Sequence, residues 1–185
     1  MNPFGFFKRL FGGGQPAATP TVTPGAPRKG PERRESDRVT NAREGTRVLV
    51  IDDSTTVLAV LRRYLEQNQY IVLEAETAEA GIQIARQEKP DLIFLDIVLP
   101  GMNGFTALRT LRREPGTKEI PVIMMSGNEQ ATEQFYAQRI GADDFMKKPF
   151  SRPELFTRIE RLLDDDKVPK RFAAGTPNPN FGAPP

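Results

Sequence analysis

The sequence predicts an α/β protein in which helices cover both faces of a parallel β-sheet. Through the middle of the chain, short apolar runs of strand length alternate with segments whose apolar residues recur at helical spacing. This alternation is typical of successive βαβ units, which form parallel sheets. Composition also indicates which part of the chain folds, because residues 46–165 hold 30 of the 34 Val, Ile and Leu residues of the 185-residue chain.

The predicted strands are apolar runs of four or five residues. They are rich in β-branched residues and bounded by polar or turn-forming residues, which favours strands buried on both faces. The four clearest runs lie at 47–51, 70–73, 92–95 and 122–125, and a fifth strand is expected at about 142–146.

Helices are predicted between these strands. Apolar residues three or four positions apart would form one buried face on each helix. The last helix also has a start signal, because Ser151 and Glu154 form a capping box. The residues with helical spacing are Val57, Val60, Leu61, Tyr64 and Leu65, then Ala78, Ile82 and Ala85, then Leu108 and Leu111, and finally Leu155, Ile159, Leu162 and Leu163.

The composition excludes several classes of protein. The chain contains no His and no Cys, which excludes a zinc site of the usual ligands, a thiol enzyme, a Ser-His-Asp triad and a disulfide. Nothing therefore argues for an oxidising compartment, and we expect a cytoplasmic protein. The apolar runs are much shorter than the about 20 residues that a membrane-spanning helix needs.

The positive charge of the chain belongs to its flanks. Net charge is +4 for residues 1–45, −4 for residues 46–165 and +2 for residues 166–185, while the whole chain has a pI near 9.0. A basic pI that arises in the flanks does not make the folded part a nucleic-acid binder. We therefore expect no nucleic-acid partner, and the sequence disfavours a DNA-binding regulator.

Polar residues follow the ends of several predicted strands. Asp52 and Asp53 follow the first strand, Asp96 ends the third, Ser126 follows the fourth and Lys148 follows the fifth. In open α/β sheets, ligands bind beyond the carboxyl ends of the strands. Carboxylates gathered there repel one another unless a cation lies among them, and an all-oxygen ligand set suits Mg²⁺.

Taken one at a time, these residues have simpler interpretations. Asp52 and Asp53 could cap a helix, and Ser126 could be an N-cap as well. Lys148 and its neighbour Lys147 could be ordinary surface lysines. The metal interpretation is favoured because carboxylates occur at two different strand ends.

Four separated motifs carry a family resemblance. The stretches VLVIDDS, PDLIFLDIVLPGMNG, PVIMMSG and GADDFMKKPF occur in that order. In this order and spacing they resemble the receiver domain of bacterial two-component response regulators, over about residues 47–163. The resemblance implies a flavodoxin-like (βα)₅ fold, which is a doubly wound parallel sheet with strand order 2-1-3-4-5.

The resemblance also implies roles for the strand-end residues. Asp96 would accept a phosphoryl group from a histidine kinase or a phosphotransfer protein and form an acyl phosphate. Asp52 and Asp53 would hold Mg²⁺ together with Asp96 and the backbone carbonyl of Val98. Lys148 would bind the phosphoryl group, and the peptide bond that follows it, to a proline, would be cis.

A switch is implied at the fourth and fifth strands. Ser126 would bond a phosphoryl oxygen once Asp96 is modified, and Gly127 would leave space beside that group. Phe145 occupies the position of the family's switch aromatic, although a Phe is more often simply a core residue. The resemblance thus predicts that phosphorylation, a local change in charge, shifts the loop at Ser126 and the ring of Phe145 between two conformations.

Receivers commonly present the fourth helix, fifth strand and fifth helix to their partners. We expect a downstream protein target to bind this face. Phe135, Tyr136 and Arg139 in the predicted fourth helix are the candidate contacts, with one of the two aromatic residues expected to belong to the core.

The flanks are predicted to be disordered, because residues 1–45 and 166–185 hold 11 of the 17 prolines and few large apolar residues. Residues 3–11 have the pattern of a short amphipathic segment, which would either dock on a partner or membrane surface or remain a disordered leader. Phe172 and Phe181 in the second flank are expected to be solvated.

These features predict a single-domain response regulator that signals by altered protein binding. It would catalyse its own phosphorylation and dephosphorylation without being a metabolic enzyme, and chemotaxis or type IV pilus (twitching) motility is the expected pathway. The alternative is a localisation or scaffold adaptor anchored by residues 1–12, with phosphorylation secondary. Recruitment to a membrane or a polar complex would then depend on that segment.

Overall fold

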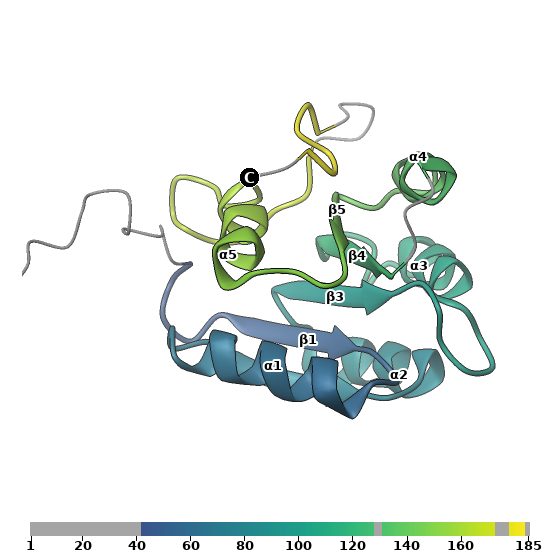
Figure 1. The fold of residues 1–185 in the computed structure, drawn as a ribbon, viewed down its shortest axis with the longest axis horizontal. Coiled ribbons are helices and arrows are strands. Elements are labelled where there is room, and N and C mark those ends of the chain that lie inside the picture. Colours follow the sequence, from purple (N-terminus) through teal and green to yellow (C-terminus); the bar gives the residue numbers. More distant parts are fainter. Residues whose placement is uncertain (1–41, 128–130, 173–177, 184–185) are drawn as a thin grey trace, which may run out of the picture. The chain divides into compact units, whose positions relative to one another are not determined.

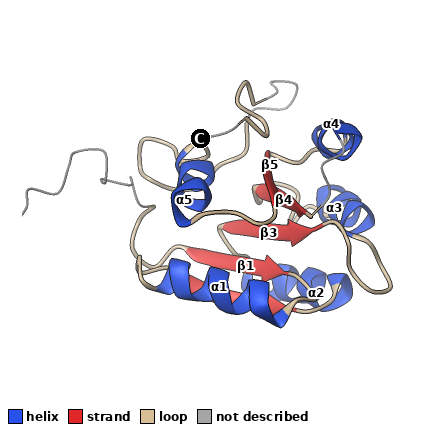
Figure 2. Cartoon of the chain, viewed as in Figure 1, coloured by secondary structure: helices blue, strands red, loops and turns tan. Residues whose placement is uncertain are grey.

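The computed structural model describes residues 42–127, 131–172 and 178–183. Within them, five parallel strands form one sheet in the order β2-β1-β3-β4-β5, which confirms the predicted fold class and strand order (Figure 2). The fifth strand begins two residues later than predicted. The strands are β1 (Arg47–Ile51), β2 (Ile71–Ala75), β3 (Leu92–Asp96), β4 (Val122–Ser126) and β5 (Asp144–Lys147).

Helices cover both faces of the sheet (Figure 1). One layer is formed by α1 and α5, whose buried residues pack with Val48 and Val50 of β1. The other layer contains α2, α3 and α4, and its core includes Leu49 and Ile51 of the same strand. The helices are α1 (Thr55–Glu66), α2 (Ala78–Glu88), α3 (Gly104–Arg113), α4 (Ala131–Arg139) and α5 (Arg152–Glu160).

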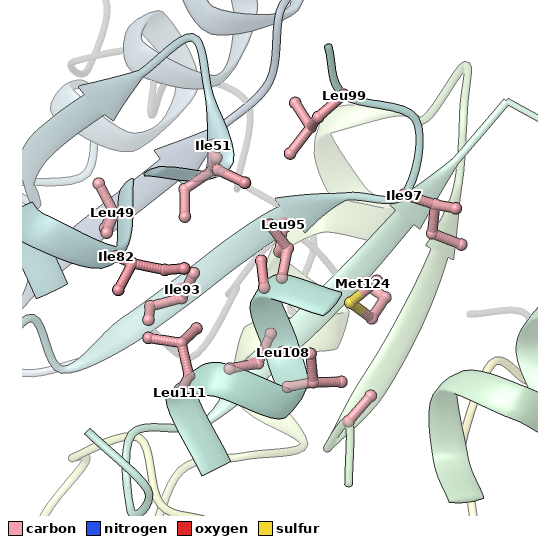
Figure 3. Packing of buried hydrophobic residues seen from close by; sticks show 14 of the residues in the cluster. Leu49, Ile51, Ile82, Ile93, Leu95, Ile97, Leu99, Leu108, Leu111 and Met124 are labelled. Atoms are coloured by element: carbon pink, nitrogen blue, oxygen red, sulfur yellow. The ribbon is translucent and has the colours of Figure 1, made fainter. Parts of the chain in front are cut away.

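The two cores follow from the strand geometry. Successive side chains of a strand point to opposite faces of the sheet, so a strand covered on both sides must be apolar at every position. All five residues of β3 and all five of β4 are buried. Figure 3 shows Ile93 and Leu95 of β3 packed with Leu108 and Leu111 of α3.

Short polar side chains cap the N-termini of helices that start after the carboxyl ends of the strands. Ser54 accepts a hydrogen bond from the amide of Val57 at the start of α1, and Asn103 caps α3 in the same way. Ser151 accepts from the amide of Glu154 at the start of α5, so the predicted helix start is confirmed. Caps of this kind satisfy amides that lack a partner within the helix.

The folded unit starts before residue 46. Ala42 is buried and its amide donates to the hydroxyl of Tyr70 at 3.0 Å, while the amide of Arg43 donates to the carbonyl of Lys167. The rest of the predicted flank, including residues 3–11, lies outside the described residues. Among the described helices, none is long and apolar enough to cross a membrane.

The C-terminal flank differs from the predicted solvated segment. Arg171 pairs with the buried carboxylate of Asp143, and the side-chain amide of Asn178 donates to the carbonyl of the same residue. Phe172 and Phe181, expected to be solvated, are partly buried against the two cores. The expectation of solvent exposure was wrong for these two rings, because composition does not show packing against parts of the chain that are distant in sequence. Within this flank, residues 173–177 and 184–185 lie outside the described residues.

Candidate functional site

The site begins where β1 and β3 end. Ile51 and Leu95 are paired in the parallel register of these neighbouring strands, so the residues that follow them, Asp52 and Asp96, emerge side by side. One carboxylate oxygen from each of Asp52, Asp53 and Asp96 lies within 4.8 Å of the others. Asp52 and Asp96 are buried, whereas Asp53 is exposed. The structure thus brings together the three carboxylates that the sequence singled out.

Lys148 supplies the positive charge among these carboxylates. Its Nζ lies 2.6 Å from Oδ2 of Asp52 and 3.0 Å from Oδ1 of Asp96. Its amide donates to the carbonyl of Ser126, and the peptide bond between Lys148 and Pro149 is cis, as predicted. Its neighbour in the chain, Lys147, is exposed.

Burial controls the protonation of the central carboxylate. It raises the pKa of Asp96 from 3.8 to about 6, an effect that the hydrogen bond and charge of Lys148 oppose and the charge of Asp52 reinforces. At neutral pH the Asp96 carboxyl group is therefore mostly ionised, although its charge is poorly solvated. A second cation among these oxygens would relieve that cost.

Ser126 ends β4 and is fully buried. Its hydroxyl donates to Oε2 of Glu133 in α4 at 2.5 Å. This bond ties the end of the strand to the helix that follows, across residues that are not described.

Phe145 is buried in the core beneath α2, α3 and α4. This placement agrees with a core residue, and its role as a switch remains a prediction. Val98 follows β3 with an exposed side chain, and the role of its carbonyl as a metal ligand also remains a prediction. A Cβ at Gly127 would have no atom within 4 Å, so there is open space beside it.

The candidate contacts on α4 have different surroundings. Tyr136 packs edge-on against Phe105 of α3, with ring centroids 4.9 Å apart, and Arg109 lies over its ring. Phe135 is 64% exposed, and Arg139 is exposed too. Of the two aromatic residues, Tyr136 therefore contributes to packing and Phe135 is available to a partner.

Two residues that support the site were not identified from the sequence. A Cβ at Gly104 would lie 2.0 Å from the carbonyl oxygen of Asp96, so α3 begins against the backbone of β3. Glu133 had no signal at all, because its bond to Ser126 depends on the packing of α4.

Buried carboxylates at adjacent strand ends, with the lysine that follows β5 between them, form a small anionic site that can hold a cation and a phosphoryl group. A family model, the response regulator receiver domain, matches residues 48–160. The chain belongs to this family. Its five-stranded parallel sheet, in the order β2-β1-β3-β4-β5, is the fold of this family.

Individual relatives support this assignment. Protein PilH of Pseudomonas aeruginosa is 41% identical over 117 residues, which cover 63% of this chain and 97% of the relative. The chain spans about half the length of other curated relatives, such as the transcriptional regulatory protein ResD of Bacillus subtilis, with 33% identity over 73% of this chain and 55% of the relative.

Solved structures of receivers share the fold. A response regulator from Chloroflexus aurantiacus has 30% identity and a TM-score of 0.61, with 63% of this chain and 96% of that chain covered. The receiver domain of the sensor histidine kinase PA1611 from Pseudomonas aeruginosa has 25% identity and a TM-score of 0.59, with 63% and 96% covered. That structure holds a magnesium ion in its active-site cleft.

We predict that Gly104→Ala lowers the free energy of unfolding by about 1–3 kcal/mol, because the added methyl group would overlap the backbone of β3 and force α3 outward. Gly116→Ala is the matched control, since a Cβ there would meet no atom within 4 Å. Urea unfolding of both variants measures the effect. Equal stability of the two variants would contradict the close approach.

The raised pKa of Asp96 predicts a pH dependence. Between pH about 4 and 6 the folded protein binds this proton and the unfolded chain does not, so the free energy of unfolding falls as pH rises through that interval. Asp96→Asn removes the buried charge and should therefore stabilise the metal-free protein by about 1–3 kcal/mol at pH 7. The gain should disappear near pH 4.

Urea unfolding in EDTA at the two pH values measures this difference. Asp53→Asn is the control, because that carboxylate is exposed. A gain for Asp96→Asn that is the same at both pH values would show that its buried charge is not the cause.

Proposed function

We propose that this protein accepts a phosphoryl group on Asp96 from a histidine kinase or phosphotransfer protein and signals by altered protein binding. The observation that carries the proposal is the placement of Lys148 between Asp52 and Asp96. Because the ammonium already touches the acceptor carboxylate, it is placed to neutralise charge on an incoming phosphoryl group. Phosphoryl transfer needs positioning and charge neutralisation more than covalent assistance.

The donor set suits a magnesium ion. Asp52, Asp53 and Asp96 offer only oxygen ligands, the kind that Mg²⁺ prefers, and a backbone carbonyl such as that of Val98 could complete the set. When bound, the ion would neutralise charge on the phosphoryl oxygens. The magnesium ion in the cleft of the related PA1611 receiver supports this part of the proposal.

Three side chains of this protein would each have a separate role in the reaction. An ionised oxygen of Asp96 attacks phosphorus, while the bond from phosphorus to the donor nitrogen breaks and its electron pair stays with the donor. Lys148 binds the transferred oxygens as a compact positive charge. Ser126 would bond one of them afterwards, and to do so its hydroxyl must leave Glu133.

One relative suggests the pathway in which the protein acts. The similarity to Protein PilH over nearly the whole of that protein supports a role in a pilus-motility or chemotaxis-type pathway. The alternative function, an adaptor anchored by residues 1–12, depends on a segment outside the described residues. A cellular assay of Asp96→Asn separates the two, because an adaptor would keep its function in this variant.

The direct test is incubation of the purified protein with acetyl phosphate and Mg²⁺, followed by intact-mass spectrometry. We expect a mass increase of one phosphoryl group that is absent with EDTA and absent in Asp96→Asn. Asp165→Asn, which changes an exposed carboxylate outside the site, should be modified like the wild type. Modification that persists in Asp96→Asn would refute the proposed acceptor.

The neighbouring lysines provide a matched pair of variants. Lys148→Gln should slow phosphorylation by about 100-fold, a typical effect of removing one charge-stabilising donor, because Lys148 contacts Asp96 directly. Lys147→Gln changes an exposed side chain and should leave the rate within about twofold. The initial rate of phosphoryl incorporation measures both. Equal rates in the two variants would remove the reason for assigning phosphoryl binding to Lys148.

A further inference from the structure

Residues 178–183, which we call the C-terminal cap, lie beside β5 and α5 in Figure 1. The side-chain amide of Asn178 donates to the carbonyl of Asp143 at 3.0 Å, and the amide of Gly182 donates to Oδ1 of Asp144 at 2.8 Å. Arg161, which ends α5, donates to the carbonyl of Ala183 at 2.9 Å. The cap is therefore held by side-chain and backbone groups from β5 and α5.

The cap also reaches α4 and the core. Gln134 donates from Nε2 to the carbonyl of Phe181 at 3.0 Å. The ring of Phe181 packs against the core cluster that contains Phe145. The ring of Phe181 is thus packed on the core, while its carbonyl accepts a hydrogen bond from Gln134 of α4. With the contacts to β5 and α5, the cap touches all three elements of the face that the sequence predicted for a partner.

Two contacts connect the cap to the proposed switch. Oδ1 of Asp144 accepts both the amide of Gly182 and the amide of Phe145, at 2.8 and 2.7 Å. On α4, the residue that binds the cap, Gln134, directly follows Glu133, which accepts the hydroxyl of Ser126. A rearrangement at the start of α4 that frees Ser126 would therefore also disturb the contact with Phe181.

We propose that the C-terminal cap is an intramolecular ligand of the α4–β5–α5 face. It covers this face in the unmodified protein and is released when Asp96 is phosphorylated. Docking of the cap stands on the contacts above, whereas its release rests on the proposed function. A few hydrogen bonds and one partly buried ring must offset the entropy of ordering six residues, so docking is readily reversed.

The cap also indicates the chemistry of the protein partner that would replace it. The face offers an apolar site for an aromatic ring, a carboxylate that accepts a backbone amide, and Gln134 and Arg161 as donors to backbone carbonyls. A partner segment that carries an aromatic residue followed by a small residue would make the same contacts. The cap and such a segment would compete for one site.

Hydrogen–deuterium exchange on the full-length chain tests docking first. In the unmodified wild type, the amide of Gly182 should exchange at least about tenfold more slowly than in an unstructured peptide of the same sequence. Phe181→Ala and Gln134→Ala should each remove most of this protection. Phe135→Ala, a change to an exposed ring on the same helix, should leave it unchanged. Exchange at the peptide rate in the wild type would overturn the proposal.

Release is tested on the same samples with Mg²⁺ and beryllofluoride, a phosphoryl mimic. The expected result is at least about a tenfold faster exchange of residues 178–183, together with altered exchange around Ser126. Altered exchange around Ser126 with an unchanged cap would overturn coupled release. No response at either place would instead indicate failure of the proposed phosphoryl site, while the docking result would still stand by itself.

Discussion

Two buried carboxylates that share one ammonium group form the interaction on which the rest of the site depends. Asp52 and Asp96 are brought together by the register of β1 and β3, and removing them from water is costly unless a positive charge lies beside them. Lys148 provides that charge from the end of β5, two strands away from β3 in the sheet. One electrostatic requirement therefore ties together three strand ends that are distant in the sequence.

A second group of buried charges lies at the other end of β5. Asp143 accepts hydrogen bonds from Arg112 of α3 and from Arg171 of the C-terminal flank, and burial raises its pKa while lowering that of Arg112 to about 10. Arg112 therefore remains charged at neutral pH. Buried ion pairs contribute little net stability because of their desolvation cost, but loss of one partner is severe. This pair therefore serves to fix where α3, β5 and the chain after α5 meet.

β5 connects these two charged regions. Asp143 and Asp144 at its start hold the C-terminal flank, Phe145 packs in the core, and Lys148 directly follows its end. Relatives of this chain differ in length, from Protein PilH, which it matches almost end to end, to ResD, of which it matches about half. Among the described residues of this chain, the surface around β5 binds a segment of the chain's own sequence.

Local patterns in the sequence were sufficient for the fold class, the approximate positions of the strands and the helix start at Ser151, since these depend on the period of apolar residues and on capping groups. The order of the strands came from the family resemblance. Asp52, Asp53 and Asp96 could be identified because parallel strands place their carboxyl ends at a common edge. The choice of Lys148 over the neighbouring lysine came from the family resemblance, and the structure does bring all four side chains together.

The tertiary structure alone decided the contacts between segments that share no periodic signal. The bond from Ser126 to Glu133, the approach of Gly104 to the backbone of Asp96 and the docking of residues 178–183 all depend on how whole elements pack. The flank after α5 has the composition of a solvated segment, yet its polar groups find buried partners. The sequence by itself determined which residues could carry charge and which could form apolar surface. Packing determined which of the charges are buried, because burial depends on neighbours that come together only when the chain folds.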